Sequence, residues 1–322
     1  MNYAIMIGKF MRRISDMTDY RYFKDGEGKI CRIHVEQDSE PLNPRYDWDG
    51  NIGHMMCWWN RYNLGDYKEN TYSEPEDFVN DLVRKHVSEK SIINYVKAKK
   101  TSNGLELKYN RSEQTWELWG YWKAWWAGNK VHYGVIANNN PIDYLIDDII
   151  DAMSFEDKWK LLERNGIECL PLNVYEHSGI TMRTSGFSCP WDSGQAGWIY
   201  TTKEEILKCG GRMKSQKGNW IKVTDRNWRE AARLWMEGEV EIYDQYLQGE
   251  CYGYIIDELD MDDQSSLESE LNVLEEDDMN WDEHTDSCWG FYSDKWGDAL
   301  IEEIASEAIS CKLFESLKEL VA

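Results

Sequence analysis

Lysine and arginine are missing from the stretch that runs from Leu234 to Asp294, although this stretch contains twenty aspartates and glutamates. The whole chain of 322 residues carries a formal net charge of -23 at pH 7. Such a negative surface repels nucleic-acid phosphates and anionic lipids, and it attracts basic protein surfaces. We therefore expect neither direct nucleic-acid binding nor a membrane partner, and we expect the partner to be a basic protein.

The chain also lacks closely spaced cysteine pairs and long apolar runs. No C-x-x-C motif occurs among its cysteines. A small secreted disulfide scaffold would be shorter and denser in cysteine. No segment approaches the roughly 18 apolar residues of a membrane span, and Met1–Arg13 does not have the charge order of a signal peptide. We expect a soluble protein in the reducing cytoplasm. The cysteines are Cys31, Cys57, Cys169, Cys189, Cys209, Cys251, Cys288 and Cys311.

Motifs for metals and phosphates are absent as well. The six histidines are dispersed without an H-x-x-x-H pair, and no Cys/His cluster has zinc spacing. The acidic stretch lacks the D-x-[DN]-x-[DN]-G pattern of a calcium loop. Neither G-x-x-x-x-G-K-[ST] nor a G-x-G-x-x-G between strand and helix is present. We expect no cofactor and no specific metal site.

The residue pattern predicts an α+β protein with antiparallel or mixed sheets and flanking helices. Turn and cap signals mark a hairpin around Asp25–Gly28, a helix with Ser73 as its N-cap, and a capping box at Thr201–Glu205. Residues 225–248 have one apolar helical face, and 298–320 predict a closing amphipathic helix. Two units are expected: an N-terminal unit with aromatic strands at 1–165, and a C-terminal unit with an acidic loop (257–286) at 166–322. Further expected elements are strands at 105–126, 167–175, 197–200, 251–256 and 287–292, and helical segments between 141 and 164.

Tryptophan is unusually frequent between Trp116 and Trp126. As a strand this run has two apolar faces, which favours a central strand in the core. An exposed platform for bases or carbohydrates is the alternative interpretation. A subunit contact is another, because Trp and Tyr dominate protein interfaces. A homo-oligomeric assembly protein is therefore one of the functions that we retain.

Two segments of the chain repeat one pattern. Trp48–Gly53 and Trp191–Gly197 both run from Trp-Asp through a glycine and an amide to a second glycine. An internal duplication with two related halves explains this, and so does chance. We expect tight turns before strands, with the aspartates bonded to turn amides.

One cluster has the residue types of a nucleophilic site. His177, Cys189 and Asp192 provide an imidazole, a thiol and an orienting carboxylate, the groups with which an enzyme could hydrolyse or modify a nucleotide or peptide. However, Pro190 removes the backbone donor after the thiol, and a turn rather than a helix follows. The favoured interpretation is structural, so we expect a non-enzymatic protein and keep this enzyme as the alternative.

Four segments carry distinctive motifs: Trp48–Cys57 with Arg61–Asp66, His177–Ile180 with Phe187–Gln195, Gly238–Leu247, and Asp286–Tyr292. These motifs resemble a family of uncharacterised proteins encoded by bacteriophages and conjugative mobile elements. The chain departs from that family at its tryptophan-rich insert and its lengthened acidic loop. The resemblance implies an accessory protein made in a bacterial host cell, a setting in which acidic proteins often block defence nucleases, some by imitating DNA. It implies no catalytic residue.

Charge, aromatic content and this resemblance together predict an inhibitor of a basic host protein that handles nucleic acid or serves in defence. Electrostatic steering of such a partner makes association fast and sensitive to salt. The contact residues that we predict are Asp257, Asp260, Asp262, Asp263, Glu275, Glu276, Asp277 and Asp278.

Overall fold

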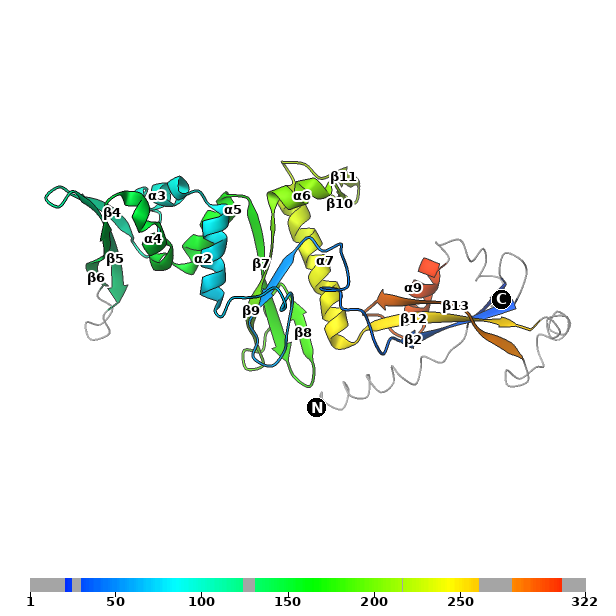
Figure 1. Ribbon diagram of the computed structural model, residues 1–322. Coiled ribbons are helices and arrows are strands. Elements are labelled where there is room, and N and C mark those ends of the chain that lie inside the picture. The colour runs from blue at the N-terminus through cyan, green and yellow to red at the C-terminus, as the bar shows by residue number, and fades with distance from the viewer. Residues whose placement is uncertain (1–20, 25–29, 124–130, 216, 261–279, 309–322) are drawn as a thin grey trace. The chain divides into compact units, whose positions relative to one another are not determined.

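The computed structural model describes residues 21–24, 30–123, 131–215, 217–260 and 280–308. Its helices and antiparallel sheets confirm the predicted α+β class (Figure 1). The chain forms two compact units. Unit 1 comprises Met1–Asp49, His177–Thr181 and Glu241–Ala322, and unit 2 comprises Gly50–Glu176 and Met182–Val240.

These units do not follow the expected boundary between residues 165 and 166. In unit 1, β2 (Ile30–Gln37) pairs antiparallel with β12 (Cys251–Leu259). In unit 2, β3 (His54–Cys57) pairs antiparallel with β9 (Ser193–Thr202). Each unit combines segments of both expected halves, because backbone hydrogen bonds join strands that lie far apart in the sequence.

The larger sheet of unit 2 has the strand order β3-β9-β7-β8. Here β7 is Ile167–Glu176 and β8 is Ile180–Arg183, so the strand predicted at 167–175 is confirmed. The strand predicted at 197–200 is longer and begins at Ser193. One core cluster of unit 2 joins this sheet to the neighbouring helices through Ile167, Leu161 and Phe78 among others. The helices in this region are α2 (Pro75–His86), α3 (Glu89–Lys97), the 3-10 helix η2 (Ile142–Leu145), α4 (Ile146–Ala152) and α5 (Phe155–Arg164).

The first residues of α2 and α5 show how proline and serine start helices in this chain. The predicted cap at Ser73 is wrong by one residue, because Glu74 occupies the N-cap position and Pro75 begins α2 without a side-chain cap. Proline is suited to this first position because it has no N–H to leave unpaired. The helical stretch after Pro141 breaks at Met153, and Ser154 then caps α5 by accepting a hydrogen bond from the amide of Asp157.

The tryptophan-rich segment forms the middle of a second sheet in unit 2. The strand order β4-β5-β6 places β5 (Thr115–Lys123) between β4 (Glu106–Asn110) and β6 (Val131–Asn139), which confirms a central strand. Leu118 is fully buried. The last residues of the run, 124–126, lie outside the described residues.

The remaining elements of unit 2 follow β9. They are α6 (Lys203–Cys209), β10 (Arg212–Lys214), β11 (Trp220–Lys222) and α7 (Trp228–Gln248), whose last residues belong to unit 1. The predicted capping box is present: Thr202 accepts a hydrogen bond from the amide of Glu205, and the Glu205 carboxylate accepts one from the amide of Thr202. Gly249, at φ +71°, ends α7 as predicted.

Replacing Thr202 by alanine is expected to destabilise unit 2 by about 1 kcal/mol, because it leaves an amide of the first turn of α6 without its acceptor. Thr202→Ser keeps the hydroxyl and serves as the matched control. Urea unfolding followed by tryptophan fluorescence measures both. Equal stability of the alanine and serine variants would show that the cap contributes nothing.

Unit 1 is built on a sheet of order β1-β2-β12-β13. Its further elements are β1 (Arg21–Lys24), β13 (Trp281–Tyr292) and α9 (Asp298–Ala308). The predicted N-terminal hairpin is confirmed by the antiparallel pairing of β1 with β2, whereas its turn lies outside the described residues. α9 covers the sheet, and Leu300 and Ile304 pack with Ile33 and Val35 of β2 in the core (Figure 1).

The predicted acidic loop at 257–286 is shorter than expected. Residues 257–259 belong to β12, and residues 281–286 belong to β13. The two strands continue their pairing past the alternating segments seen in the sequence, with Leu259 opposite Trp281. The closing helix begins at Asp298 as predicted. The prediction for residues 309–320 lies outside the described residues. In the described part of the chain, no helix is long and apolar enough to cross a membrane.

Candidate functional site

The predicted partner-binding acids fall into three groups. Asp257 is buried, with 2% of its surface exposed, and pairs with the Nε of Arg32 at 2.8 Å. This geometry corrects its prediction as a contact residue, because the carboxylate faces the neighbouring strand. Asp260 is exposed as predicted. Asp262, Asp263, Glu275, Glu276, Asp277 and Asp278 lie outside the described residues.

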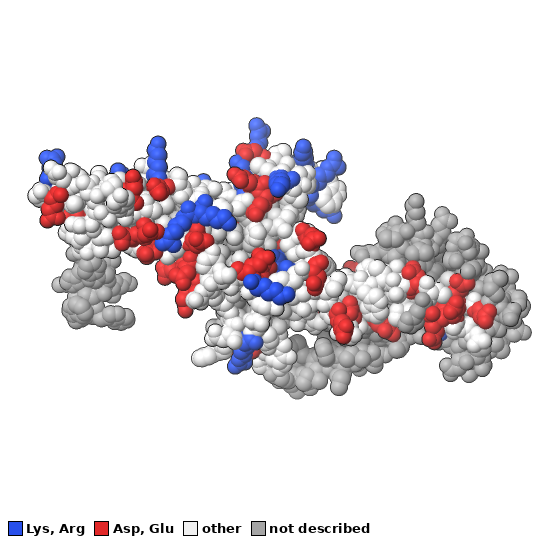
Figure 2. Space-filling view, viewed as in Figure 1, with Lys and Arg blue, Asp and Glu red and all other residues white. Residues whose placement is uncertain are grey.

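Acidic side chains nevertheless lie close together at the end of β12 and the start of β13. Glu258 lies directly opposite Asp282, and the amide of Asp260 donates a hydrogen bond to the carbonyl of Asn280 at 3.0 Å. Asp282 and Glu283 are exposed. We call Glu258, Asp260, Asp282 and Glu283 the acidic hairpin end. In the view of Figure 2, red side chains predominate over blue on the described surface of unit 1.

The structure brings together two of the three residues of the alternative catalytic site. The thiol of Cys189 donates to the Oδ2 of Asp192 at 3.7 Å, and the hydroxyl of Ser193 donates to the carbonyl of Cys189. His177 belongs to unit 1, whereas Cys189 and Asp192 belong to unit 2. A strand, β9, follows Cys189 in the sequence. The thiol therefore does not lie at a helix N-terminus, which agrees with the prediction that no helix follows it. The enzyme alternative stays a prediction.

A polar cleft lies at one end of the β3-β9-β7 sheet of unit 2. Because these strands are antiparallel, the end of β3, the start of β9 and the end of β7 meet at the same edge. The amide of Trp58 donates to the carbonyl of Ala196 at 2.7 Å, and the amide of Glu176 donates to the carbonyl of Asp192 at 2.8 Å. We call this cavity of about 500 Å³ the Trp191 cleft. Its lining consists of Trp58, Trp59, Asn60, Arg61, Glu176, Trp191, Asp192, Ser193 and Gln195.

Glu176 holds the cleft together electrostatically. Its two carboxylate oxygens accept hydrogen bonds from the indole Nε1 of Trp59 at 3.0 Å and from the Nη1 of Arg61 at 2.7 Å. These two hydrogen bonds lower the pKa of Glu176 below its usual value. The carboxylate is therefore ionised at neutral pH and offsets the charge of Arg61. Trp191, in contrast, leaves 92% of its surface exposed.

Small residues allow the strands around the cleft to approach closely. A Cβ on Gly197 would clash with the carbonyl oxygen of Met56 on β3, and one on Gly194 would lie 3.4 Å from the ring of Trp59. Gly197 lies within β9, as the strand predicted at 197–200 requires, and Gly194 also lies within β9 rather than in the tight turn that we predicted before the strand. The reason for glycine here is the close approach of a neighbouring strand and ring.

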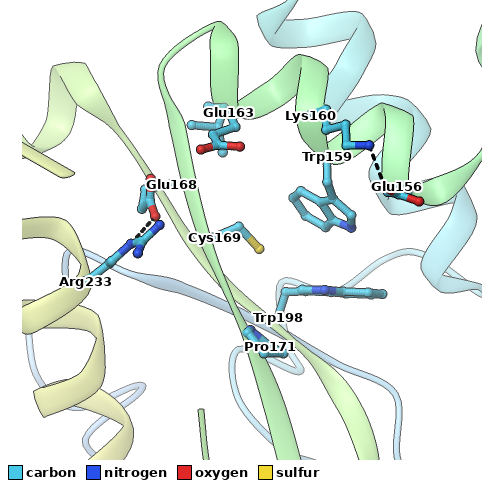
Figure 3. Close-up of a pocket in the computed structure, with 10 residues that line it drawn as sticks. Glu156, Trp159, Lys160, Glu163, Glu168, Cys169, Pro171, Trp198 and Arg233 are labelled. Atoms are coloured by element: carbon cyan, nitrogen blue, oxygen red, sulfur yellow. Dashed lines mark hydrogen bonds and ion pairs between the residues drawn. The ribbon is translucent and has the colours of Figure 1, made fainter. Parts of the chain in front are cut away.

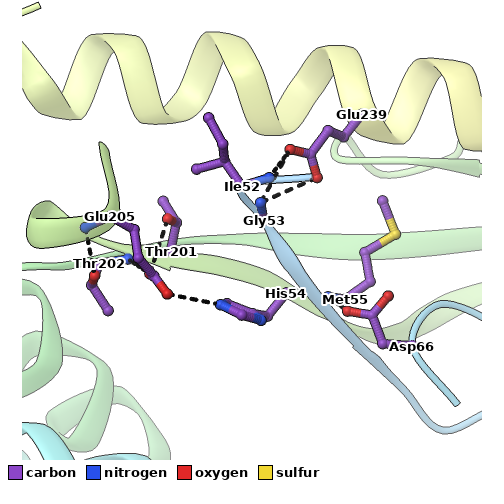
Figure 4. A network of polar contacts seen from close by, with 9 residues as sticks. All are labelled: Ile52, Gly53, His54, Met55, Asp66, Thr201, Thr202, Glu205 and Glu239. Atoms are coloured by element: carbon purple, nitrogen blue, oxygen red, sulfur yellow. Dashed lines mark hydrogen bonds and ion pairs between the residues drawn. The ribbon is translucent and has the colours of Figure 1, made fainter. Parts of the chain in front are cut away.

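The first of the two repeated segments is also held differently from the prediction. The amides of Ile52 and Gly53 donate to the carboxylate of Glu239 on α7, at 2.6 Å and 3.1 Å to Oε1 (Figure 4). A distant helix therefore supplies the acceptor that we expected from the local aspartate. Next to it, His54 lies 3.0 Å from the Oε1 of Glu205, so the capping box of α6 also contacts β3.

A second cavity of about 370 Å³ lies between α5 and β7 in unit 2 (Figure 3). The rings of Trp159 and Trp198 line it at a centroid distance of 5.4 Å, beside the thiol of Cys169. Burial raises the pKa of Cys169, so the thiol is protonated at neutral pH. Buried Glu168 pairs with Arg229 at 2.7 Å and with Arg233 at 2.5 Å. The paired charges and the neutral thiol describe a structural region rather than a reactive one.

Sequence reasoning did not identify the Trp191 cleft. Arg61 and Trp191 belong to motif segments, but their common location depends on strand pairing between positions more than a hundred residues apart. The repeated Trp-Asp pattern was the available signal, since β3, which follows the first copy, pairs with β9, which begins within the second. No group of three or more His, Cys, Asp or Glu residues in the described ranges is arranged to hold a metal ion.

Comparisons with known protein families, curated proteins and solved structures found no match to this chain.

Proposed function

We propose that the protein is a non-catalytic inhibitor made by a bacteriophage or mobile element, which acts in the bacterial cytoplasm. Its target is a basic host protein that handles nucleic acid or serves in defence, and the contact is made by the acidic hairpin end. The observation that carries the proposal is the cross-strand pair of Glu258 and Asp282, in a stretch without any lysine or arginine.

Like charges directly opposite each other destabilise a sheet. The acidic hairpin end also presents Asp260 and Glu283 on its exposed surface. Arg32, on the neighbouring strand β2, is buried and paired with Asp257. A solubilising surface needs net charge but does not need this crowding. A basic partner supplies the opposite charge at this end, which supports a binding role for this end of the hairpin. The motif resemblance supports the phage or mobile-element setting.

Salt dependence tests the electrostatic part of the proposal. Tagged protein captures its partner from bacterial lysate at about 0.1 M salt and releases it at about 1 M, because the Debye length falls from about 10 Å to about 3 Å. With the purified partner, neutralising Asp260, Asp282 and Glu283 as Asn, Asn and Gln is expected to slow association by about tenfold or more.

The matched control removes the same charge from unit 2, with Glu69→Gln, Asp143→Asn and Glu230→Gln, all at exposed positions. A smaller effect of this variant on association separates a local contact from general charge. Equal effects of the two variants, or association that salt leaves unchanged, would reject the acidic hairpin end as the contact surface.

A further inference from the structure

The Trp191 cleft combines a solvent-exposed indole ring with polar side chains at exposed positions. Trp191 is the most exposed of the large hydrophobic side chains in the described part of the chain. The amide of Asn60 and the guanidinium of Arg61 lie at exposed positions beside it. The geometry assigns only one N–H of Arg61 to Glu176, and a guanidinium has five. Hydrogen-bond donors and acceptors therefore line the same cleft as one exposed indole ring.

The charges of the cleft narrow the ligand class. Glu176 and Asp192 disfavour a phosphate, and the cation of the lining, Arg61, is already paired with Glu176. The charge of Arg61 also disfavours a cationic ligand beside this carboxylate. A neutral ligand with many hydroxyl groups and an apolar face fits these conditions. Pyranose sugars have this character, since their axial C–H groups form an apolar face and their hydroxyls lie around the rim.

We propose that the Trp191 cleft binds a sugar ring of a neutral oligosaccharide. The C–H face of the ring stacks on the indole of Trp191, as aromatic side chains bury apolar surface beside a polar edge. Asn60, Arg61 and Gln195 exchange hydrogen bonds with hydroxyls at the rim of the ring. The cavity of about 500 Å³ is within the size range of small-molecule sites. This function is independent of the partner contact proposed for unit 1.

Glu176 is not arranged as the acid of a glycosidase. Glycosidases need a carboxylic acid whose pKa is raised, so that it can protonate the leaving oxygen. Glu176 has the opposite property, because the hydrogen bonds from Trp59 and Arg61 lower its pKa and occupy both of its oxygens. We therefore expect the oligosaccharide to be recovered intact.

Titration of the full chain with cellotetraose, maltotetraose and chitotetraose tests the proposal, with binding measured by calorimetry. At least one of them is expected to bind with a Kd of about 1 mM or below, which corresponds to about -4 kcal/mol. Trp191→Ala is expected to weaken that binding by tenfold or more. Because the side chain is so exposed, the substitution should leave the thermal unfolding temperature nearly unchanged.

Trp220→Ala is the matched control, since Trp220 is 62% exposed on β11 and does not line the cleft. Its binding should equal that of the unmodified chain. Failure of all three sugars to bind at about 10 mM would overturn the proposal, as would binding that survives Trp191→Ala. Adenosine and N-acetylarginine amide serve as competing probes, and a Trp191-dependent affinity for either that exceeds the sugar affinity would also overturn it.

Discussion

Asp157→Ala is expected to lower the free energy of unfolding of unit 2 by about 3 kcal/mol, because it leaves buried hydrogen-bond donors without an acceptor. Asp157 is fully buried. Its carboxylate accepts from the hydroxyls of Tyr95, Ser102 and Ser154 at 2.9, 2.8 and 2.7 Å, and from the amide of Ser102 at 2.7 Å. One carboxylate thus joins α3, the segment after it and the start of α5.

The same carboxylate makes unit 2 sensitive to acid. Burial by itself raises the pKa of Asp157, but the hydrogen bonds from Ser154, Ser102 and Tyr95 outweigh it, and the pKa lies below the ordinary value. A carboxyl with a lowered folded-state pKa stabilises the protein above its unfolded pKa of about 3.9. This stability is lost as the pH falls through the folded-state pKa.

Urea unfolding of Asp157→Asn at pH 7 and at progressively lower pH measures how much stability depends on the ionised carboxylate of Asp157. The amide cannot replace an acceptor of four hydrogen bonds, so we expect a large difference from the unmodified chain at pH 7. The difference should shrink below about pH 4, where the native carboxylate begins to lose its advantage. Asp143→Asn, at an exposed position, should show almost no difference at either pH. A constant difference at all pH values would contradict the role of the ionised carboxylate.

Local signals predicted much of the fold because their causes lie within a few residues. The Thr202–Glu205 capping box and the glycine end of α7 need only neighbouring residues, and both are present. The Asp157 cluster has no such signal, since Tyr95 lies 62 positions away in the sequence. Two units were predicted, but their boundary was wrong for the same reason, because unit 1 depends on the pairing of β2 with β12.

Burial explains the different outcomes for the predicted acidic contacts. Composition indicated that residues near 257–260 carry negative charge, and Asp260 is exposed as this implies. Composition cannot tell which acid of a run points inward. Asp257 lies within β12, whereas Asp260 follows its last residue, Leu259. Arg32, the residue opposite Asp257, is distant in the sequence. The Trp191 cleft required the same kind of long-range information.

Removing the buried acid of unit 1 gives the second large effect that we expect. Asp257→Ala should destabilise the β2–β12 pair by about 3 to 5 kcal/mol, the usual result of deleting one partner of a buried ion pair. Asp257 and Arg32 lie directly opposite each other, and the Arg32 side chain is only 11% exposed. The ring of Trp281 covers the guanidinium at 4.5 Å. The substitution leaves this cation buried without its opposing carboxylate.

Hydrogen exchange of the β2 and β12 amides, followed by mass spectrometry, measures the loss within unit 1 without requiring the whole chain to unfold at once. Exposed Asp260→Ala is the control and should change protection by less than about 0.5 kcal/mol. The double variant Arg32→Met with Asp257→Leu removes both charges, and it should recover most of the lost protection. If the double variant is as unprotected as Asp257→Ala, the cost arises from lost packing or other contacts rather than from an uncompensated charge. Recovery by the double variant would instead show that Asp257 acts inside the sheet, so that any loss of partner binding in Asp257→Ala reflects the sheet and not a missing contact.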